Sequence, residues 1–163
     1  MKYKKAQQTM SMPFGMIFAI FLIIVFVVFA FMAVGGFLDI GKSADVGMFY
    51  DELQEEVNDA MRGQSSESTF RINLPKKIKQ VCFANLSATI TNPGSEYDAI
   101  RNYEVYEANT FLLPPEFASN MQWKMIDHID VAKITATKNP YCVNVKDDLK
   151  IKKSFYDRKV TIA

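Results

Sequence analysis

The chain has 163 residues, a formal net charge of +1 and 49% hydrophobic residues, values that an ordinary small soluble protein would also show. These averages combine a very apolar first quarter with a polar remainder, so one modest independent domain is expected after the apolar part. The near-neutral charge gives no overall basic bias of the kind that marks nucleic-acid binding, and no nucleic acid is expected as a partner.

The apolar stretch near the N-terminus predicts a membrane-spanning helix over residues 13–38. No charged residue lies between Lys5 and Asp39, and the run from Phe14 to Phe31 is almost wholly Phe, Ile, Leu, Val, Met and Ala. A helix needs roughly 20 apolar residues to cross the hydrocarbon core. A cleavable secretory signal and a buried core helix are the alternatives, but a signal has an apolar region of only about 7–15 residues. Membrane lipid is therefore the first expected partner.

The charges on either side of this span predict its orientation. Three lysines precede it within the first five residues, whereas the segment from Asp39 to Met61 carries seven acidic residues and one basic residue. Because positive charge stays in the cytoplasm, residues 1–12 are expected inside, as a cytoplasmic N-terminus or a signal-like segment, and everything after the span outside. The chain is therefore expected in the cell membrane as a single-pass protein with an extracytoplasmic C-terminal domain.

Beyond the span, apolar residues recur mostly at steps of four or five among acidic residues, which predicts an amphipathic stalk helix over residues 39–63. Gly63 is a natural end for this helix. Residues 64–68 are polar and predict a short linker, after which a β domain is expected over residues 69–163. The acidic stretch that begins at Asp39 has a net charge of −6, and the chain that follows it has a net charge of +4. These charges could pair within one chain or between neighbouring copies, or lie on solvated faces.

The pattern after the linker changes to a period of two, which predicts short antiparallel strands. Strands are expected near residues 70–74, 78–84, 88–91, 105–113, 125–137, 141–145, 149–151 and 160–162. Polar turns separate them about every ten residues, as in a small antiparallel sandwich or sheet. The predicted fold class is therefore α+β, with a long N-terminal transmembrane and amphipathic helix followed by a small antiparallel β-sandwich-like domain.

Two cysteines, Cys82 and Cys142, each lie in an expected strand. An extracytoplasmic location permits a disulfide between them. Such a bond would close a loop of about 60 residues and stabilise the fold by several kcal/mol in the chain-entropy description. Two buried free thiols are the alternative. Neither cysteine has a histidine or cysteine at metal-ligand spacing, so no metal site is predicted.

No catalytic constellation stands out, and the sequence predicts a protein that is not an enzyme and has no cofactor or small-molecule substrate. His128 is the only histidine, and it alternates with apolar residues as a surface or edge position in a strand would. Gly-rich phosphate loops, His-Glu-x-x-His motifs and acidic calcium loops are all missing from the sequence. Asn85-Leu86-Ser87 fits the N-glycosylation acceptor pattern, so Asn85 is a candidate glycan site.

Apolar side chains flank the proline pair at positions 114 and 115, namely Phe111, Leu112, Leu113, Phe117 and Trp123. They could form an exposed contact surface. A loop folded over the sheet as a satellite of the core is the preferred interpretation.

The order of these features, together with the sequence Lys4-Lys5-Ala6-Gln7, resembles archaeal type IV pilins and archaellins over about the first 60 residues. Proteins of this family carry a class III signal, which a membrane peptidase cuts between a small residue and a following Gln. The resemblance implies cleavage between Ala6 and Gln7. It also implies that the apolar helix leaves the bilayer and packs in a filament core, with the β head outside.

The leading hypothesis is a structural, pilin-like subunit of a cell-surface filament that associates with itself or with related subunits through its N-terminal helix. The alternative is a permanently membrane-anchored envelope protein whose β domain binds a partner protein or a glycan. The two hypotheses differ in whether the helix stays in the lipid and in what the β domain contacts.

Overall fold

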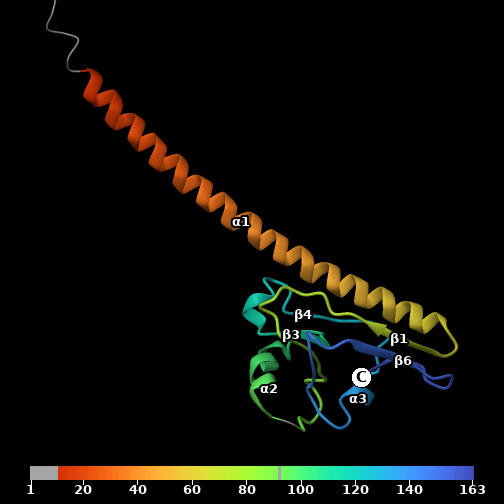
Figure 1. Ribbon diagram of the computed structural model, residues 1–163. Coiled ribbons are helices and arrows are strands. Elements are labelled where there is room, and N and C mark those ends of the chain that lie inside the picture. The colour runs from red at the N-terminus through yellow and green to blue at the C-terminus, as the bar shows by residue number, and fades with distance from the viewer. Residues whose placement is uncertain (1–10, 92) are drawn as a thin grey trace, which may run out of the picture. The chain divides into compact units, whose positions relative to one another are not determined.

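The computed structural model describes residues 11–91 and 93–163, with side chains from Phe14 onward except at 37–40 and 42 (Figure 1). The elements in chain order are α1 (Ser11–Arg62), β1 (Ser66–Phe70), β2 (Gln80–Phe83), α2 (Ser95–Ile100), the 3-10 helix η1 (Arg101–Tyr103), β3 (Thr110–Leu113), the 3-10 helix η2 (Pro115–Phe117), β4 (Trp123–Lys124), α3 (Val131–Ile134), β5 (Tyr141–Asn144), β6 (Leu149–Lys153) and β7 (Thr161–Ile162). The chain divides into two compact units. The first ends at Ile40, and the second, called the head below, runs from Gly41 to Ala163.

Helix α1 supplies the apolar part of the first unit. Its stretch Phe14–Gly36, called the apolar segment below, has 23 residues and no buried residue, and the most apolar 18 consecutive residues within it have a mean hydropathy of 3.3. At a rise of about 1.5 Å per residue it is about 35 Å long, which is enough to cross a hydrocarbon core of about 30 Å. No other stretch of the described residues has this length and composition, which suit either a membrane span or a signal sequence.

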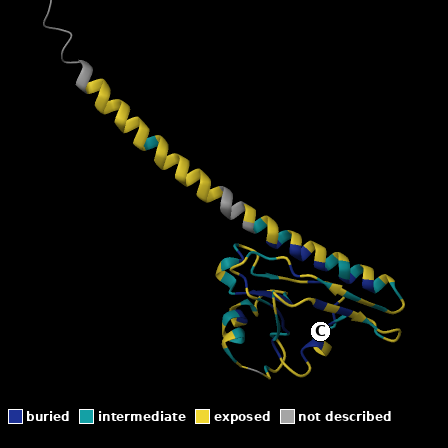
Figure 2. Ribbon diagram, in the orientation of Figure 1, coloured by how far each residue is buried: buried dark blue, intermediate teal, exposed yellow. Residues whose placement is uncertain are grey.

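The part of α1 that belongs to the head is amphipathic (Figure 2). Its buried side chains are Val46, Phe49, Tyr50, Leu53, Val57 and Ala60. This spacing places them on one face of the helix, where they join the main core. The helix ends at Arg62, directly before Gly63, as the sequence predicted.

Besides its part of α1, the head contains two antiparallel sheets and the short helices α2, η1, η2 and α3. One sheet has the strand order β1-β6-β7 and the other β4-β3-β2-β5. Side chains of both sheets meet the buried face of α1 in one cluster, for example Phe83 of β2 and Ile151 of β6. Because neighbouring residues of a strand point to opposite faces, Phe111 of β3 packs instead with Ile100 of α2 in a second cluster. The predicted α+β class, with a long helix followed by packed antiparallel sheets, is confirmed.

A disulfide joins Cys82 of β2 to Cys142 of β5, two residues that face each other in the strand pairing. Their Cα atoms are 4.0 Å apart, and 60 positions separate them in sequence. In the chain-entropy description a loop of this size makes the bond worth about 4 kcal/mol. The structure confirms the predicted disulfide, and the alternative of two free thiols is wrong.

Strands β2, β5, β6 and β7 confirm the strands predicted near residues 78–84, 141–145, 149–151 and 160–162. The strand predicted over 70–74 is misplaced, because β1 occupies Ser66–Phe70 and begins inside the stretch predicted as a linker. β1 pairs only with β6 and lies at the edge of its sheet. A strand with one solvated face and an open edge can be largely polar, so its residues resemble a linker.

Three other predicted strands are wrong in whole or in part. Residues 88–91 form no strand, and the strand predicted over 105–113 is reduced to β3 at Thr110–Leu113. The segment 125–137 contains the short helix α3 instead of a strand. The Asp130 carboxylate caps this helix by accepting a hydrogen bond from the backbone N–H of Lys133 at 3.0 Å. Such a local cap overrides the strand preference of the β-branched residues around it.

Candidate functional site

The structure places the sequence-predicted site residues in separate parts of the chain. Ala6 and Gln7 lie outside the described residues, so the cleavage between them stays a prediction. Asn85 lies two residues after the end of β2 and has a half-buried side chain, and Ser87 of the same acceptor pattern is exposed in a turn. Glycan attachment at Asn85 also stays a prediction. His128 is exposed, but it lies in a loop with a left-handed backbone (φ 66°) and not in a strand.

The apolar side chains around the proline pair belong to the core, as preferred from the sequence. The buried members are Phe111, Leu112 and Leu113, and the half-buried members are Phe117 and Trp123. The last two pack against the core clusters. The loop therefore offers no separate exposed contact surface.

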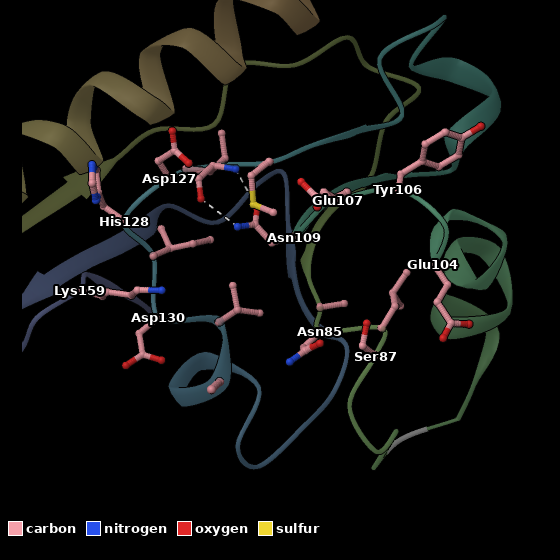
Figure 3. Close-up of a pocket in the computed structure, with 18 of the residues that line it drawn as sticks. Asn85, Ser87, Glu104, Tyr106, Glu107, Asn109, Asp127, His128, Asp130 and Lys159 are labelled. Atoms are coloured by element: carbon pink, nitrogen blue, oxygen red, sulfur yellow. Dashed lines mark hydrogen bonds between the residues drawn. The ribbon is translucent and has the colours of Figure 1, made fainter.

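An open groove of about 620 Å³ lies beside Asn85 and His128 (Figure 3). Its charged side chains include Glu104, Glu107, Asp127, Asp130 and Lys159. Figure 3 shows that the labelled side chains do not converge on one point, since His128 and Glu104 lie at opposite sides of the groove. Within residues 11–91 and 93–163, no three His, Cys, Asp or Glu side chains are placed to hold a metal ion.

Two buried asparagines form hydrogen bonds with backbone groups of residues that line this groove. The side-chain Nδ2 of Asn109 donates to the carbonyl of Ile126 at 2.8 Å, and its Oδ1 accepts from the N–H of the same residue at 2.9 Å. Asn139 does the same for Asn85, with Oδ1 accepting from the N–H at 3.2 Å and Nδ2 donating to the carbonyl at 2.9 Å. Neither residue is predictable from the sequence, because a single asparagine in a polar stretch carries no signal of burial.

The outer side of α1 in the head carries a row of carboxylates. Asp51 and Asp59 each have an ion-pair partner, at 3.4 and 2.9 Å. Glu52, Glu55 and Glu56, called the acidic face below, make no ion pair with any residue that the structure describes. The first two are exposed and the third is half-buried. The acidic face therefore leaves three negative charges without a cationic partner among the described residues of the head.

The loop between β6 and β7, Ser154–Lys159, is called the tip below. Asp157 fixes its shape, because its carboxylate accepts hydrogen bonds from Lys133 Nζ at 3.1 Å and from the N–H of Ser154 at 3.2 Å. The N–H of Asp157 in turn donates to the carbonyl of Ser154 at 3.0 Å. These interactions, with the Lys133 hydrogen bond first, hold the pKa of Asp157 below its usual range. The tip is thus a turn ordered by its own carboxylate.

The ordered tip presents two aromatic rings and two cations to solvent. Phe155 is 62% exposed and Tyr156 is 92% exposed, and their rings meet edge to face with centroids 5.3 Å apart. Arg158 and Lys159 are exposed beside them and form no ion pair within the described part of the chain. Large exposed aromatic side chains on a rigid turn are typical of a contact surface.

Comparisons of the chain with protein-family profiles, with curated proteins and with solved structures find no match. The function is therefore inferred from the apolar segment, the groove, the acidic face and the tip.

Proposed function

We propose that this chain is a structural, pilin-like subunit of a cell-surface filament, with its head displayed outside the membrane. The proposal is supported chiefly by the two roles of helix α1. One helix provides an apolar segment without a buried residue and also one wall of the core of the head. A subunit that leaves the lipid and packs with its copies needs an exposed apolar helix joined directly to a folded domain.

The apolar segment suits lateral packing between copies. It contains no charged side chain, so a neighbouring helix packed along it would bury no unpaired charge. Apolar helices in a membrane associate through van der Waals packing, and a filament core keeps the same surface away from water. The proposed partners are membrane lipid before assembly, and further copies or related subunits afterwards.

The disulfide supports a head that lies outside the cytoplasm, because cytosolic reductants keep most thiols reduced. The lysines before the apolar segment and the acidic residues after it favour the same orientation. An assembled head in this location would meet the extracellular solvent directly.

The mass of the native full-length protein, purified separately from membranes and from sheared surface material, tests the proposal. We expect the sheared material to contain polymers of a chain that begins at Gln7. An intact Met1 confined to the membrane fraction, with no polymer, would contradict it.

An Ala6→Leu variant places a large residue at the junction and should stay uncut in the membrane. The matched variant Ala6→Gly keeps a small residue and should be cut and assembled.

A second candidate function is a permanently anchored protein whose head binds a partner protein or a glycan. The open groove beside Asn85 favours it, as do the exposed side chains of Val105 (83%) and Tyr106 (49%). Crosslinking of intact membranes discriminates between the two functions. The anchored protein should give a heterologous neighbour at the head, whereas the filament subunit should give a ladder of contacts with its own copies.

A further inference from the structure

The head carries two exposed surfaces of opposite charge that make no ion pair with each other within one chain. The tip contributes Arg158 and Lys159, and the acidic face contributes three carboxylates on α1. Both surfaces lie in the same compact unit. The tip is therefore positively charged and the acidic face negatively charged.

The two surfaces also match in their apolar parts. The tip exposes Phe155 and Tyr156 next to its cations. On α1, Met48 is 58% exposed and lies four residues before Glu52, so the two side chains are neighbours on the same helix face. A methionine is a flexible partner for aromatic rings, with a favourable sulfur-ring contact. The aromatic and cationic tip is thus chemically complementary to the surface of Met48 and the glutamates on α1.

We propose that the tip of one copy docks on the acidic face of α1 in a second copy. Arg158 and Lys159 pair with the glutamates there, and Phe155 and Tyr156 pack over Met48. This inference rests on the proposed function, because it names a contact through which the heads of a filament meet. The docking gives the exposed rings and cations of the tip a role in contact with a second copy.

A contact between two different patches of the same protein is heterologous, and this decides what it can build. Such a contact repeats from copy to copy and gives either a closed ring or an open helical array. A self-complementary patch would stop at a dimer. The separation of the tip and the acidic face on the head is therefore consistent with a filament.

Photocrosslinking in the full-length chain tests the docking directly. Tyr156 is replaced by the photoreactive residue p-benzoylphenylalanine, and assembled material is irradiated and digested with trypsin. We expect a crosslink to the tryptic peptide 43–62 of a second copy, which contains the acidic face and Met48. The same replacement at Val105, which is also highly exposed (83%) but lies outside the tip, serves as the control and should not label this peptide. A crosslink to lipid, or to a different part of the chain, would overturn the proposal.

Charge exchange tests the electrostatic part. The double reversal Arg158→Glu and Lys159→Glu should lower the yield of the crosslink by about tenfold or more, because like charges brought together at an interface are strongly unfavourable. The reversal Glu52→Arg and Glu55→Arg on α1 should do the same, and combining both reversals should restore the yield. In all these variants the yield is measured as the covalent dimer before digestion, because the new arginines add tryptic sites within peptide 43–62. Reversal of two other exposed lysines, Lys138→Glu and Lys146→Glu, should leave it unchanged. A combined variant that keeps the folded head but not the crosslink would contradict the pairing.

These results separate the docking from the proposed function. Polymers that begin at Gln7 but give no crosslink between the tip and α1 would overturn the docking and leave the filament subunit standing. Crosslinked pairs in membranes that never yield a polymer would support the docking and contradict the filament.

Discussion

Asn109 is a buried side chain, 7% exposed, that completes the hydrogen bonding of the backbone of Ile126. Replacement of Asn109 by alanine would leave one N–H and one C=O group without a partner in a site with little access to water. We expect the free energy of unfolding to fall by about 2–6 kcal/mol, since each of the two unsatisfied buried groups costs about 1–3 kcal/mol. Chemical unfolding of the full chain in detergent, followed through the fluorescence of Trp123, measures the change.

The matched control for this change is Asn120→Ala. Asn120 is exposed, so its loss should change the stability by less than about 0.5 kcal/mol. Equal effects of the two substitutions would show that the amide of Asn109 contributes no more than a surface group.

The stability of the tip depends on pH through Asp157, and the direction of this dependence is defined. Its pKa is lowered in the folded protein, chiefly by the hydrogen bond from Lys133. The carboxylate therefore stabilises the tip above the ordinary aspartate pKa of about 4, and this stabilisation is lost as the pH falls through the lower folded value. We expect Lys133→Met to raise the pKa of Asp157 toward its ordinary value, so that the tip loosens at a higher pH than in the wild type. An NMR titration of the Asp157 carboxyl carbon measures the shift.

Lys138→Met is the control for this titration. Lys138 is exposed and forms no ion pair within the described residues. Its replacement removes the same charge from the surface without touching the tip. A similar rise in the pKa of Asp157 with both variants would mean that general surface charge, and not the hydrogen bond, sets its value.

At the scale of elements, the attachment of α1 to the sheets depends on one helix face. Phe49 is 1% exposed and packs with Tyr50 and with Phe70 of β1, at ring distances of 5.4 and 5.9 Å. We expect Phe49→Ala to lower the free energy of unfolding of the head by about 3–5 kcal/mol, because it removes a buried ring and leaves a cavity. The adjacent Met48→Ala removes an exposed side chain and should have little effect on stability. Thermal unfolding of both variants by near-ultraviolet circular dichroism makes the comparison.

The sequence predicted those elements whose residues carry a periodic apolar signal. The helix end near Gly63 and the strands around Cys82 and Cys142 follow from spacing, and the disulfide follows from the expected compartment. The same reasoning failed for β1, because an edge strand exposes polar residues, and for α3, because its cap at Asp130 depends on one local hydrogen bond.

The surfaces of the head were less predictable than its elements. The charges on α1 and in the following chain were visible in the sequence, but their separation into paired and unpaired groups was not. Asp51 pairs with a lysine of β4, 73 positions away, whereas the neighbouring Glu52 pairs with no cation that the structure describes. Only the folded chain decides which of two adjacent carboxylates is neutralised. The groove and its asparagines depend on the same long-range contacts.

At the scale of the whole molecule, the chain joins a segment suited to lipid with a domain suited to water. Val25 lies at the middle of the apolar segment. We expect Val25→Lys to impair insertion, because a lysine at the centre of a spanning helix costs about 2.5–3.5 kcal/mol. Extraction of membranes at alkaline pH should then release a larger fraction of the variant than of the wild type. Val25→Leu, which keeps the apolar character, should stay in the membrane, and equal release of both variants would contradict a spanning role.

The bond between Cys82 and Cys142 has a consequence for the head if, as we propose, it is displayed outside the cell, where it would meet proteases. The 60-position interval contains α2, α3 and most of the exposed loops, and exposed loop tips are the preferred sites of proteolytic nicking. A cut anywhere in this interval separates the backbone into two pieces, yet the disulfide keeps them covalently joined at β2 and β5. The piece that carries β6, β7 and the tip thus remains attached to the piece that carries α1. A nicked chain would stay covalently joined as long as its surroundings stay oxidising.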